Sequence, residues 1–262
     1  FEEFRARTGA PRNTLANRLT ALVRHGVLER SASREGGAQR AYVLTPMGRA
    51  LHDHVLLAWS WGIRWSAVAP TGPTSLVHSG CGKAMLAVAT CAHCGEDLKL
   101  HACTHRPGPG TGVETVPATR QHRRRQPGGG SRQPLDVVDI TGDRWTGLVV
   151  SSQFFGAHRF DAIQSMLDIA TNILSDRLRA LVASGVLERR LYQMAPQRHE
   201  YWLTQKGRDL YAHALALLLW GDAWLAGRRG PPLVIVHRTC GRTVGMNVVC
   251  SECREPLQPG SV

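Results

Sequence analysis

Lysine is scarce in this sequence, and no apolar stretch is long enough to cross a membrane. Of the 32 basic residues only 3 are lysines, and 29 are arginines. The most apolar stretch runs from Leu210 to Trp220, with His213 inside it. That is well short of the roughly 18 residues of a membrane span. No secretory signal opens the chain, so we expect a cytoplasmic protein with no membrane partner.

Catalytic motifs are lacking as well. The sequence shows no Ser–His–Asp set, no phosphate-binding loop and no metal motif with an open position. We therefore expect a protein that is not an enzyme. The one alternative is a redox role for the pair Cys91 and Cys94, which would make the protein an enzyme.

The charge balance is strongly basic, with a formal net charge of +12 and a pI of about 10.1. Such an excess indicates an anionic partner such as double-stranded DNA. The arginine bias is also typical of a GC-rich genome, and part of the excess lies between residues 120 and 132. Charge alone does not decide whether the excess serves a nucleic-acid partner.

The sequence contains one unit twice. Shifted by 159 residues, it aligns with itself without a gap, and about a third of the paired positions over residues 1–98 are identical. The aligned pairs include Phe1 with Phe160, Gly26–Arg30 with Gly185–Arg189, Trp61 with Trp220, and Cys81 with Cys240. A period this long indicates two complete domains.

Both copies show the same order of elements. In copy one the pattern predicts helices at 1–8, 11–24 and 45–65, with strands at 27–30 and 41–44. Copy two repeats this with helices at 160–167, 171–183 and 204–225 and strands at 186–192 and 200–203, preceded by a helix at 143–154. Leu15, Leu19 and Leu22 form one apolar face, and Thr45 is a predicted N-cap. Copy one has no counterpart of 135–159, so we expect its first helix to be missing.

This order is typical of a winged helix-turn-helix. The predicted fold class is α+β, mainly α, with two winged helices and a small zinc-ribbon-like extension after each. The predicted domains are winged helix one at 1–70, ribbon one at 71–101, a disordered basic linker at 102–135, winged helix two at 136–228 and ribbon two at 229–262.

A set of short motifs carries a family resemblance. They are Gly142–Thr146, Arg159–Phe160, Leu174–Leu178, Gly185–Leu187, Pro196–Arg198, Tyr201–Thr204 and Gly207. In this order they resemble the HxlR-type transcriptional regulators over 142–225 and, truncated, over 1–66. The resemblance implies a DNA-binding winged helix that pairs through its first and last helices. Copy one departs from it in the wing, where Gln39 stands at the position of Arg198, and neither winged helix has the cysteine through which some members sense oxidants.

The second helix of each helix-turn-helix is the predicted reading helix, because base edges in the major groove are read by Asn, Gln and Arg. Asn13 and Asn172 match between the copies. The wing arginines are expected to contact the DNA backbone. The full predicted DNA-binding set is Arg12, Asn13, Asn17, Arg18, Thr20, Arg34, Arg40, Thr171, Asn172, Ser175, Arg177, Arg179, Arg190 and Arg198.

Two points in this set stay open. Arg18 and Arg177 flank the apolar stripe, so each can hold a phosphate or buttress its helix. Asp176 is unfavourable near DNA, although a carboxylate can accept a hydrogen bond from cytosine. The outward residues differ between the copies, which predicts unlike half-sites.

Six of the seven cysteines form two sets with one spacing, His-x2-Cys-x9-Cys-x2-Cys. The first is His78, Cys81, Cys91 and Cys94, and the second is His237, Cys240, Cys250 and Cys253. Four nitrogen and sulfur ligands are what a closed structural zinc site needs, so we predict two zinc ions, one within each copy. A redox pair and an iron–sulfur centre are the alternatives. His93 competes with His78 as a ligand. Cys103 can bind a metal together with His101 and His105, but we interpret it as a loose linker thiol.

Together these features predict a sequence-specific DNA-binding regulator, a repressor, with tandem winged helices paired within the chain or as a homodimer. Trp61, Trp65, Trp220 and Trp224 are either core residues or partner-helix contacts. The rival interpretation is a protein-interaction or metal-responsive module with reduced DNA binding. The sequence does not identify a small-molecule effector.

Overall fold

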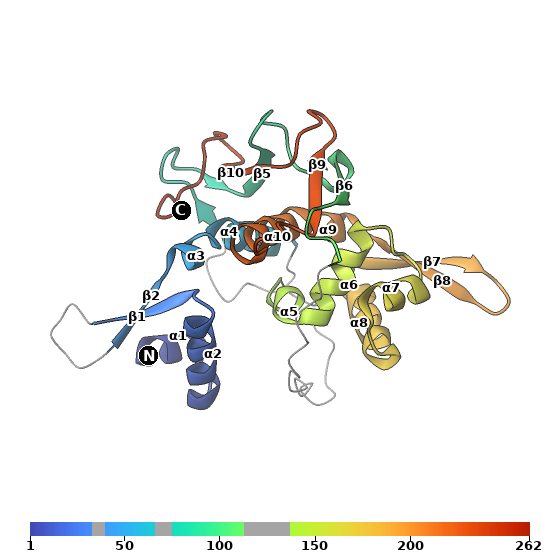
Figure 1. Ribbon diagram of the computed structural model, residues 1–262, viewed down its shortest axis with the longest axis horizontal. Coiled ribbons are helices and arrows are strands. Elements are labelled where there is room, and N and C mark those ends of the chain that lie inside the picture. The colour runs from blue at the N-terminus through green and yellow to red at the C-terminus, as the bar shows by residue number, and fades with distance from the viewer. Residues whose placement is uncertain (33–39, 66–74, 113–136) are drawn as a thin grey trace. The chain divides into compact units, whose positions relative to one another are not determined.

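The computed structural model describes residues 1–32, 40–65, 75–112 and 137–262 (Figure 1). They divide into two compact units, Phe1–Asp53 and His54–Val262. Within the described residues the strands form five two-stranded sheets, and helices make up most of the rest. This content confirms the predicted class, α+β and mainly helical. None of the described helices is long and apolar enough to span a membrane.

The first unit packs two short helices against a strand. Its elements are α1 (Glu2–Thr8), α2 (Arg12–Arg24), β1 (Leu28–Ala32), β2 (Arg40–Leu44) and α3 (Pro46–Arg49). Leu15 and Leu19 lie one turn apart on α2, so they share a face, and they are buried together with Leu28. Gly26 has a φ of 74°, a left-handed conformation that glycine adopts without strain at the end of a helix.

The second unit contains the other winged helix with its leading helices. Its elements are α5 (Val137–Gly142), α6 (Arg144–Phe154), α7 (Phe160–Leu167), α8 (Thr171–Ala183), β7 (Leu187–Gln193), β8 (Arg198–Leu203), α9 (Gln205–Arg208) and α10 (Tyr211–Leu225). Leu174, Leu178 and Leu181 of α8 are each at most 1% exposed. The sequence pattern did not predict α5.

The sequence predicts one long helix after each capping threonine, but the structure has two consecutive helices there. Thr45 and Thr204 do cap, since their hydroxyls accept hydrogen bonds from the N–H groups of Gly48 and Gly207. The first helix of each pair then ends after one turn. Leu51 N–H bonds to the carbonyl of Gly48, three residues back, and this tighter bond interrupts the α-helical ladder. In copy one the second helix, α4, spans His52–Trp65.

The segments predicted as two separate ribbons form three two-stranded sheets, and two of these sheets combine strands from both copies. Their elements are β3 (Leu76–Val77), β4 (Ala84–Met85), β5 (Ala87–Cys91), the 3-10 helix η1 (Leu100–Ala102), β6 (Cys103–Pro107), β9 (Leu233–His237) and β10 (Met246–Cys250). Strand β5 pairs with β10, and β6 pairs with β9, both antiparallel (Figure 1). We call residues 75–107 and 233–257 the joint domain.

The joint domain corrects two predictions. A ribbon confined to one copy is wrong, because each pair β5–β10 and β6–β9 takes one strand from each copy. The linker does not begin at residue 102, because β6 occupies 103–107. Residues 113–136, predicted to be disordered, lie outside the described residues. The other predicted domain boundaries stay predictions.

The two long helices α4 and α10 meet through a reciprocal histidine contact. The rings of His54 and His213, which are 159 positions apart, stack with centroids 4.1 Å apart. Each Nδ1 lies 3.4 Å from the other residue's backbone carbonyl oxygen. Burial lowers the pKa of His54, and burial together with His54 lowers the pKa of His213 to about 4. The pair is therefore neutral at neutral pH.

The tryptophans near the ends of these helices differ in burial. Trp61 is 4% exposed and donates to the carbonyl of Lys206 at 2.8 Å, so a copy-one tryptophan packs on copy two. Trp65 donates to the carboxylate of Asp209 at 3.0 Å. Trp224 is 43% exposed. Burial is confirmed for Trp61, and Trp224 is not a core residue, so of the two predicted roles only a partner-helix contact stays a prediction for Trp224.

Leu22 was predicted to be a core residue, and it is 39% exposed. Its counterpart Leu181 is fully buried. The difference follows from α6, which packs on α8 in the second unit. The described residues of the first unit contain no counterpart of α6.

This difference predicts unequal effects of one substitution. Leu181→Ala should lower the free energy of unfolding by about 2–5 kcal/mol, because it removes buried methyl groups and leaves a cavity. Leu22→Ala should lower the free energy of unfolding by less than about 1 kcal/mol, because much of that side chain already contacts water. Urea unfolding followed by circular dichroism measures both. Equal losses would show that Leu22 is covered in solution.

The histidine pair predicts a pH dependence. The pKa of His213 is depressed to about 4 from 6.5, so the unfolded chain binds a proton that the folded chain excludes. The stability from this group is present above about pH 6.5 and is lost as the pH falls towards about 4.

His213→Asn should therefore flatten the decline in unfolding temperature between about pH 7 and about pH 5. His25→Asn, at an exposed position of the first unit, is the control and should leave the decline as in the parent chain. Parallel pH curves for all three proteins would contradict a neutral buried pair.

Candidate metal centres and nucleic-acid interface

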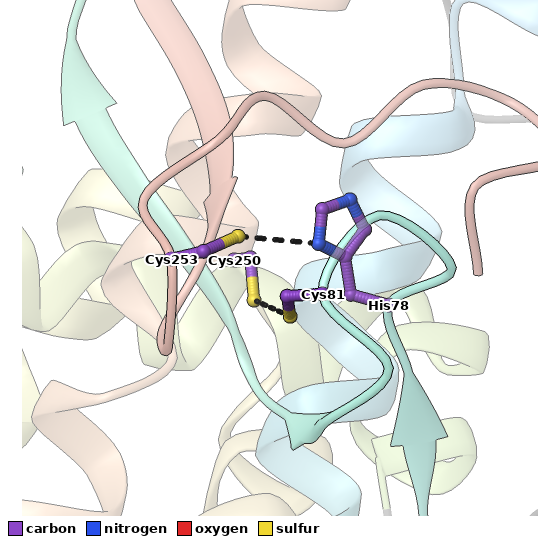
Figure 2. A group of neighbouring side chains, drawn as sticks. All are labelled: His78, Cys81, Cys250 and Cys253. Atoms are coloured by element: carbon purple, nitrogen blue, oxygen red, sulfur yellow. Dashed lines mark hydrogen bonds between the residues drawn. The ribbon is translucent and has the colours of Figure 1, made fainter.

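The eight predicted metal ligands gather in two clusters, and each cluster takes ligands from both copies. The first cluster is His78, Cys81, Cys250 and Cys253, and the second is Cys91, Cys94, His237 and Cys240. The predicted residues are therefore brought together, but the predicted grouping within one copy is wrong. Figure 2 shows His78 and Cys81 facing Cys250 and Cys253 from the other copy.

The spacing of the ligand atoms fits a tetrahedral site. In the first cluster Cys81 Sγ lies 4.0 Å from Cys250 Sγ, and Cys253 Sγ lies 3.3 Å from His78 Nδ1. The second cluster has a sulfur–sulfur distance of 3.9 Å and nitrogen–sulfur distances of 3.3 and 3.5 Å. Ideal zinc bonds place two sulfurs about 3.8 Å apart and a sulfur and a nitrogen about 3.6 Å apart. The sulfurs are too far apart for disulfides.

Tight turns present the ligands in pairs. After His78 the chain turns through Gly82, whose φ is 69° and whose N–H bonds to the His78 carbonyl at 2.7 Å. A Cβ built at Gly80 would lie 2.8 Å from the His78 ring, so a larger residue there would have to displace that ring, whereas copy two carries Thr239 at the matching position. The turn after Cys91 uses Gly95, and the matching residue of copy two, Arg254, has the same left-handed backbone.

The turns favour the deprotonated form of the first cysteine in each pair. For the second, Cys94 or Cys253, a backbone hydrogen bond lowers the pKa, but burial and the neighbouring cysteines outweigh that bond and raise the pKa. Burial raises the pKa of the Cys91 thiol, but hydrogen bonds from the backbone N–H groups of His93 and Cys94 outweigh burial and lower it. Cys250 has a lowered pKa for the same reasons, with N–H groups two and three residues further along the chain. Thiolate is the form of cysteine that binds a metal.

Both histidines direct Nδ1 at the cysteines and are buried, with exposed fractions of 4% for His78 and 0% for His237. The other ring nitrogen of His237, Nε2, is buried without a hydrogen-bond partner among the described residues. His93, the competing ligand, is in neither cluster.

Cys103 is not a loose linker thiol. It is buried in β6, where its backbone pairs with that of His237. Burial raises the pKa of its thiol. Neither cluster includes Cys103.

The predicted reading helices keep their polar faces exposed. On α2 the exposed residues are Arg12, Asn13, Asn17, Arg18, Thr20 and Arg24, and on α8 they are Thr171, Asn172, Asp176, Arg179 and Ala183. Ser175 is half-buried. Asp176 and Arg179 pair at 2.9 Å, so the carboxylate that is unfavourable near DNA is neutralised within its own helix.

Arg177 lies in contact with the leading helix. Its guanidinium makes two hydrogen bonds to the Asp143 carboxylate, the shorter 2.7 Å, and Asp143 also caps α6 through Thr146 N–H. Burial opposes ionisation of Asp143, but these bonds lower its pKa. Of the two roles left open for Arg177, this geometry is that of a buttress. Arg18 has no such partner in the described part of its unit.

The wing of copy two is β7–β8. Arg190 pairs with Glu188 at 2.6 Å and lies over the Trp202 ring, whereas Arg198 is exposed at the start of β8. Thr171 accepts a hydrogen bond from Gln164. In copy one, Arg34 and the side chain of Arg40 lie outside the described residues.

Comparison with known proteins matches this architecture to one family. The model of the HxlR-like helix-turn-helix family matches residues 1–69 and 140–229. The chain belongs to the HxlR-like helix-turn-helix family. The match falls once on each copy, so this HxlR-like protein has two helix-turn-helix regions, and it is a DNA-binding transcriptional regulator.

Individual proteins are similar to parts of the chain. The chain is 40% identical over 126 residues to an uncharacterised HTH-type transcriptional regulator of Mycobacterium tuberculosis, covering 48% of this chain and 80% of the relative. It is 35% identical over 90 residues to the uncharacterised HTH-type transcriptional regulator YvaP of Bacillus subtilis, covering 34% and 83%. The reduced form of the transcriptional regulator YodB of Bacillus subtilis is 30% identical, with a TM-score of 0.30, over 33% of this chain and 85% of that one.

The crossed ligand sets of this HxlR-like protein predict which double substitutions remove which metal. Cys91→Ser with His237→Ala alters one cluster, so the full chain should keep one metal ion of two. Cys91→Ser with His78→Ala alters both clusters, so it should keep none. Elemental analysis of the purified chains measures the content.

The two double variants are matched controls for each other, since each removes one cysteine and one histidine. Ligand sets confined to one copy require the opposite result, with one metal ion kept after Cys91→Ser with His78→Ala. That result would overturn the crossed arrangement.

Proposed function

We propose that both winged helices bind DNA, and that the chain acts as an intramolecular pseudo-dimer. The observation that carries this proposal is the set of contacts between matching residues of the two copies. His54 stacks on His213, β5 pairs with β10, and each metal cluster uses ligands from both copies. A chain that joins its own halves in this way needs no second chain to present two reading helices.

Base recognition falls to the exposed faces of α2 and α8. Asn13 and Asn172 occupy the same position on the two helices, and asparagine can make two hydrogen bonds to adenine. Arg12, Arg190 and Arg198 contact phosphates and orient the protein without specifying sequence. Arg177 supports α8 through Asp143.

The two half-sites differ in this proposal. Asn17, Thr20 and Arg24 face outward on α2, where α8 has Asp176, Arg179 and Ala183. Different side chains read different base edges. The preferred operator is therefore an imperfect palindrome whose halves are one or a few helical turns apart.

The metal in both clusters is zinc, in a structural role. Zinc favours four tetrahedral nitrogen and sulfur ligands, and the sulfur–sulfur and sulfur–nitrogen distances are close to that geometry. Four protein ligands leave no open position for a substrate. The elemental analysis above also tests the identity of the metal: two zinc ions per chain are expected, and the absorbance of an iron–sulfur cluster would contradict zinc.

The regulator represses transcription in the cytoplasm in this proposal, because a joined pseudo-dimer that covers an operator blocks RNA polymerase without any further surface. The effector is not part of the proposal. Binding of a protein in place of DNA is the rival function, and the DNA experiment below separates the two.

DNA binding can be tested with an operator selected from random fragments by the full chain. Affinity should fall steeply with salt, because phosphate contacts release counterions. Asn172→Ala should weaken the binding free energy for the selected operator by about 1–3 kcal/mol and relax the preference for one base. Arg198→Ala should weaken all sequences alike. Fluorescence anisotropy at two salt concentrations measures each value.

Asn247→Ala, an exposed asparagine of the joint domain, is the matched control and should leave the affinity unchanged. If neither Asn172→Ala nor Arg198→Ala changes the affinity, the assigned docking face is wrong. If the chain with its metal bound fails to bind DNA even at low salt, DNA binding is wrong and the rival function, binding of a protein, is favoured.

A further inference from the structure

A large pocket lies in the second unit, bounded by α6, α10 and β6. Its volume is about 1190 Å³, and apolar side chains dominate its lining. Leu148 of α6 and Leu217 and Leu218 of α10 contribute to its walls, and Phe155 lies beside β6, where it contacts His105 edge-on. Pockets of this kind, apolar with a few polar groups, are the usual form of small-molecule sites.

One acidic residue in this lining is unexpected. Asp222 lies near the end of α10, where the matching residue of copy one is Ile63, packed against a hydrophobic core. Asp222 has no hydrogen-bond or ion-pair partner among the described residues, and burial raises its pKa. A partly desolvated carboxylate without a partner is costly for the protein alone.

The other charged groups of the lining are already engaged. Asp143 is paired with Arg177. Arg208 donates to the Leu203 carbonyl, and Arg238 donates to the Cys103 carbonyl. Arg144 lies over the ring of Trp145. Asp222 is therefore the carboxylate of this lining that has no partner among the described residues.

We propose that the pocket binds an amphipathic organic cation, with its apolar body between α6 and α10 and its ammonium group at the Asp222 carboxylate. The ammonium group supplies the charge and hydrogen bonds that Asp222 lacks, and the leucines bury the apolar body. This site does not depend on DNA binding, because its ligand contacts are confined to the pocket.

Three probes of equal chain length test the proposal on the full chain: octylammonium, 1-octanol and octanoate. Calorimetric titration should give the tightest binding for octylammonium, weaker binding for octanol and the weakest for octanoate. Asp222→Asn should weaken the binding of octylammonium by about tenfold, because the ion pair in a partly desolvated site is lost. It should leave octanol unchanged. Asp161→Asn, an exposed aspartate on α7, is the charge control.

A second pair of variants tests the location. Gly221 lines the pocket, and a Cβ built there has no heavy atom within 4 Å, so Gly221→Leu adds apolar bulk next to Asp222 without a clash at the Cβ. It should weaken binding of all three probes. Ala223→Leu adds the same side chain at an exposed position two residues on and should leave binding intact. Circular dichroism and metal content confirm that each variant is folded.

Several results would overturn the proposal. These are no saturable binding of any probe, equal affinity for the three probes, or an unchanged preference for octylammonium in Asp222→Asn. Self-association of the chain that Gly221→Leu abolishes would assign the pocket to an interface between copies instead. DNA is absent from every titration, so failure here is distinct from failure of the proposed function.

Discussion

The second unit joins the two copies through two Cys/His clusters, each of which takes its side chains from both copies. In the first cluster, His78 and Cys253 are 175 residues apart, whereas His78 and Cys94 within one copy are only 16 apart. The entropy of loop closure rises slowly with length, so the longer loop costs only about 2 kcal/mol more. Structural zinc binding contributes on the order of 10–16 kcal/mol. The strand pairs β5–β10 and β6–β9 can therefore determine whether each cluster is shared between the copies or formed within one copy.

Those strand pairs also explain how the apolar core is shared. Cys91 and Cys250 end the paired strands β5 and β10 and are buried in one hydrophobic cluster. Leu56 of α4 and Leu215 of α10 belong to the same cluster. A small ribbon has too little apolar surface to form a stable core alone. Two ribbons joined over the packed helices α4 and α10 bury more apolar surface. This favours the structure in which the copies share strands and ligands over two separate ribbons.

The parts of the fold that the sequence predicts are those set by local chemistry. The apolar spacing of Leu15 and Leu19, the left-handed Gly26 and the capping hydroxyl of Thr45 each act within a few residues. The burial of Leu22 depended on a packing partner outside that range, and that prediction was wrong.

The grouping of the metal ligands could not be read from the sequence for a different reason. The pair Cys91–Cys94 has the same spacing as Cys250–Cys253, so either pair supplies the same ligands to His78 and Cys81. Ligand chemistry is identical in the two arrangements. Only the long-range pairing of strands distinguishes them, and a repeated sequence carries no local signal of that pairing.

Sharing the clusters constrains the ligands and the reading faces differently. With the metal role proposed above, a ligand lost from either copy breaks a cluster shared with the other copy, so the proposed metal binding requires all eight ligands. The reading faces are under no such mutual constraint, because no ligand or strand pair depends on them. Asn17 can become Asp176 in the second copy, and Thr20 can become Arg179. One chain can thus keep its shared ligand clusters while its two reading helices diverge, which a homodimer of identical chains cannot do.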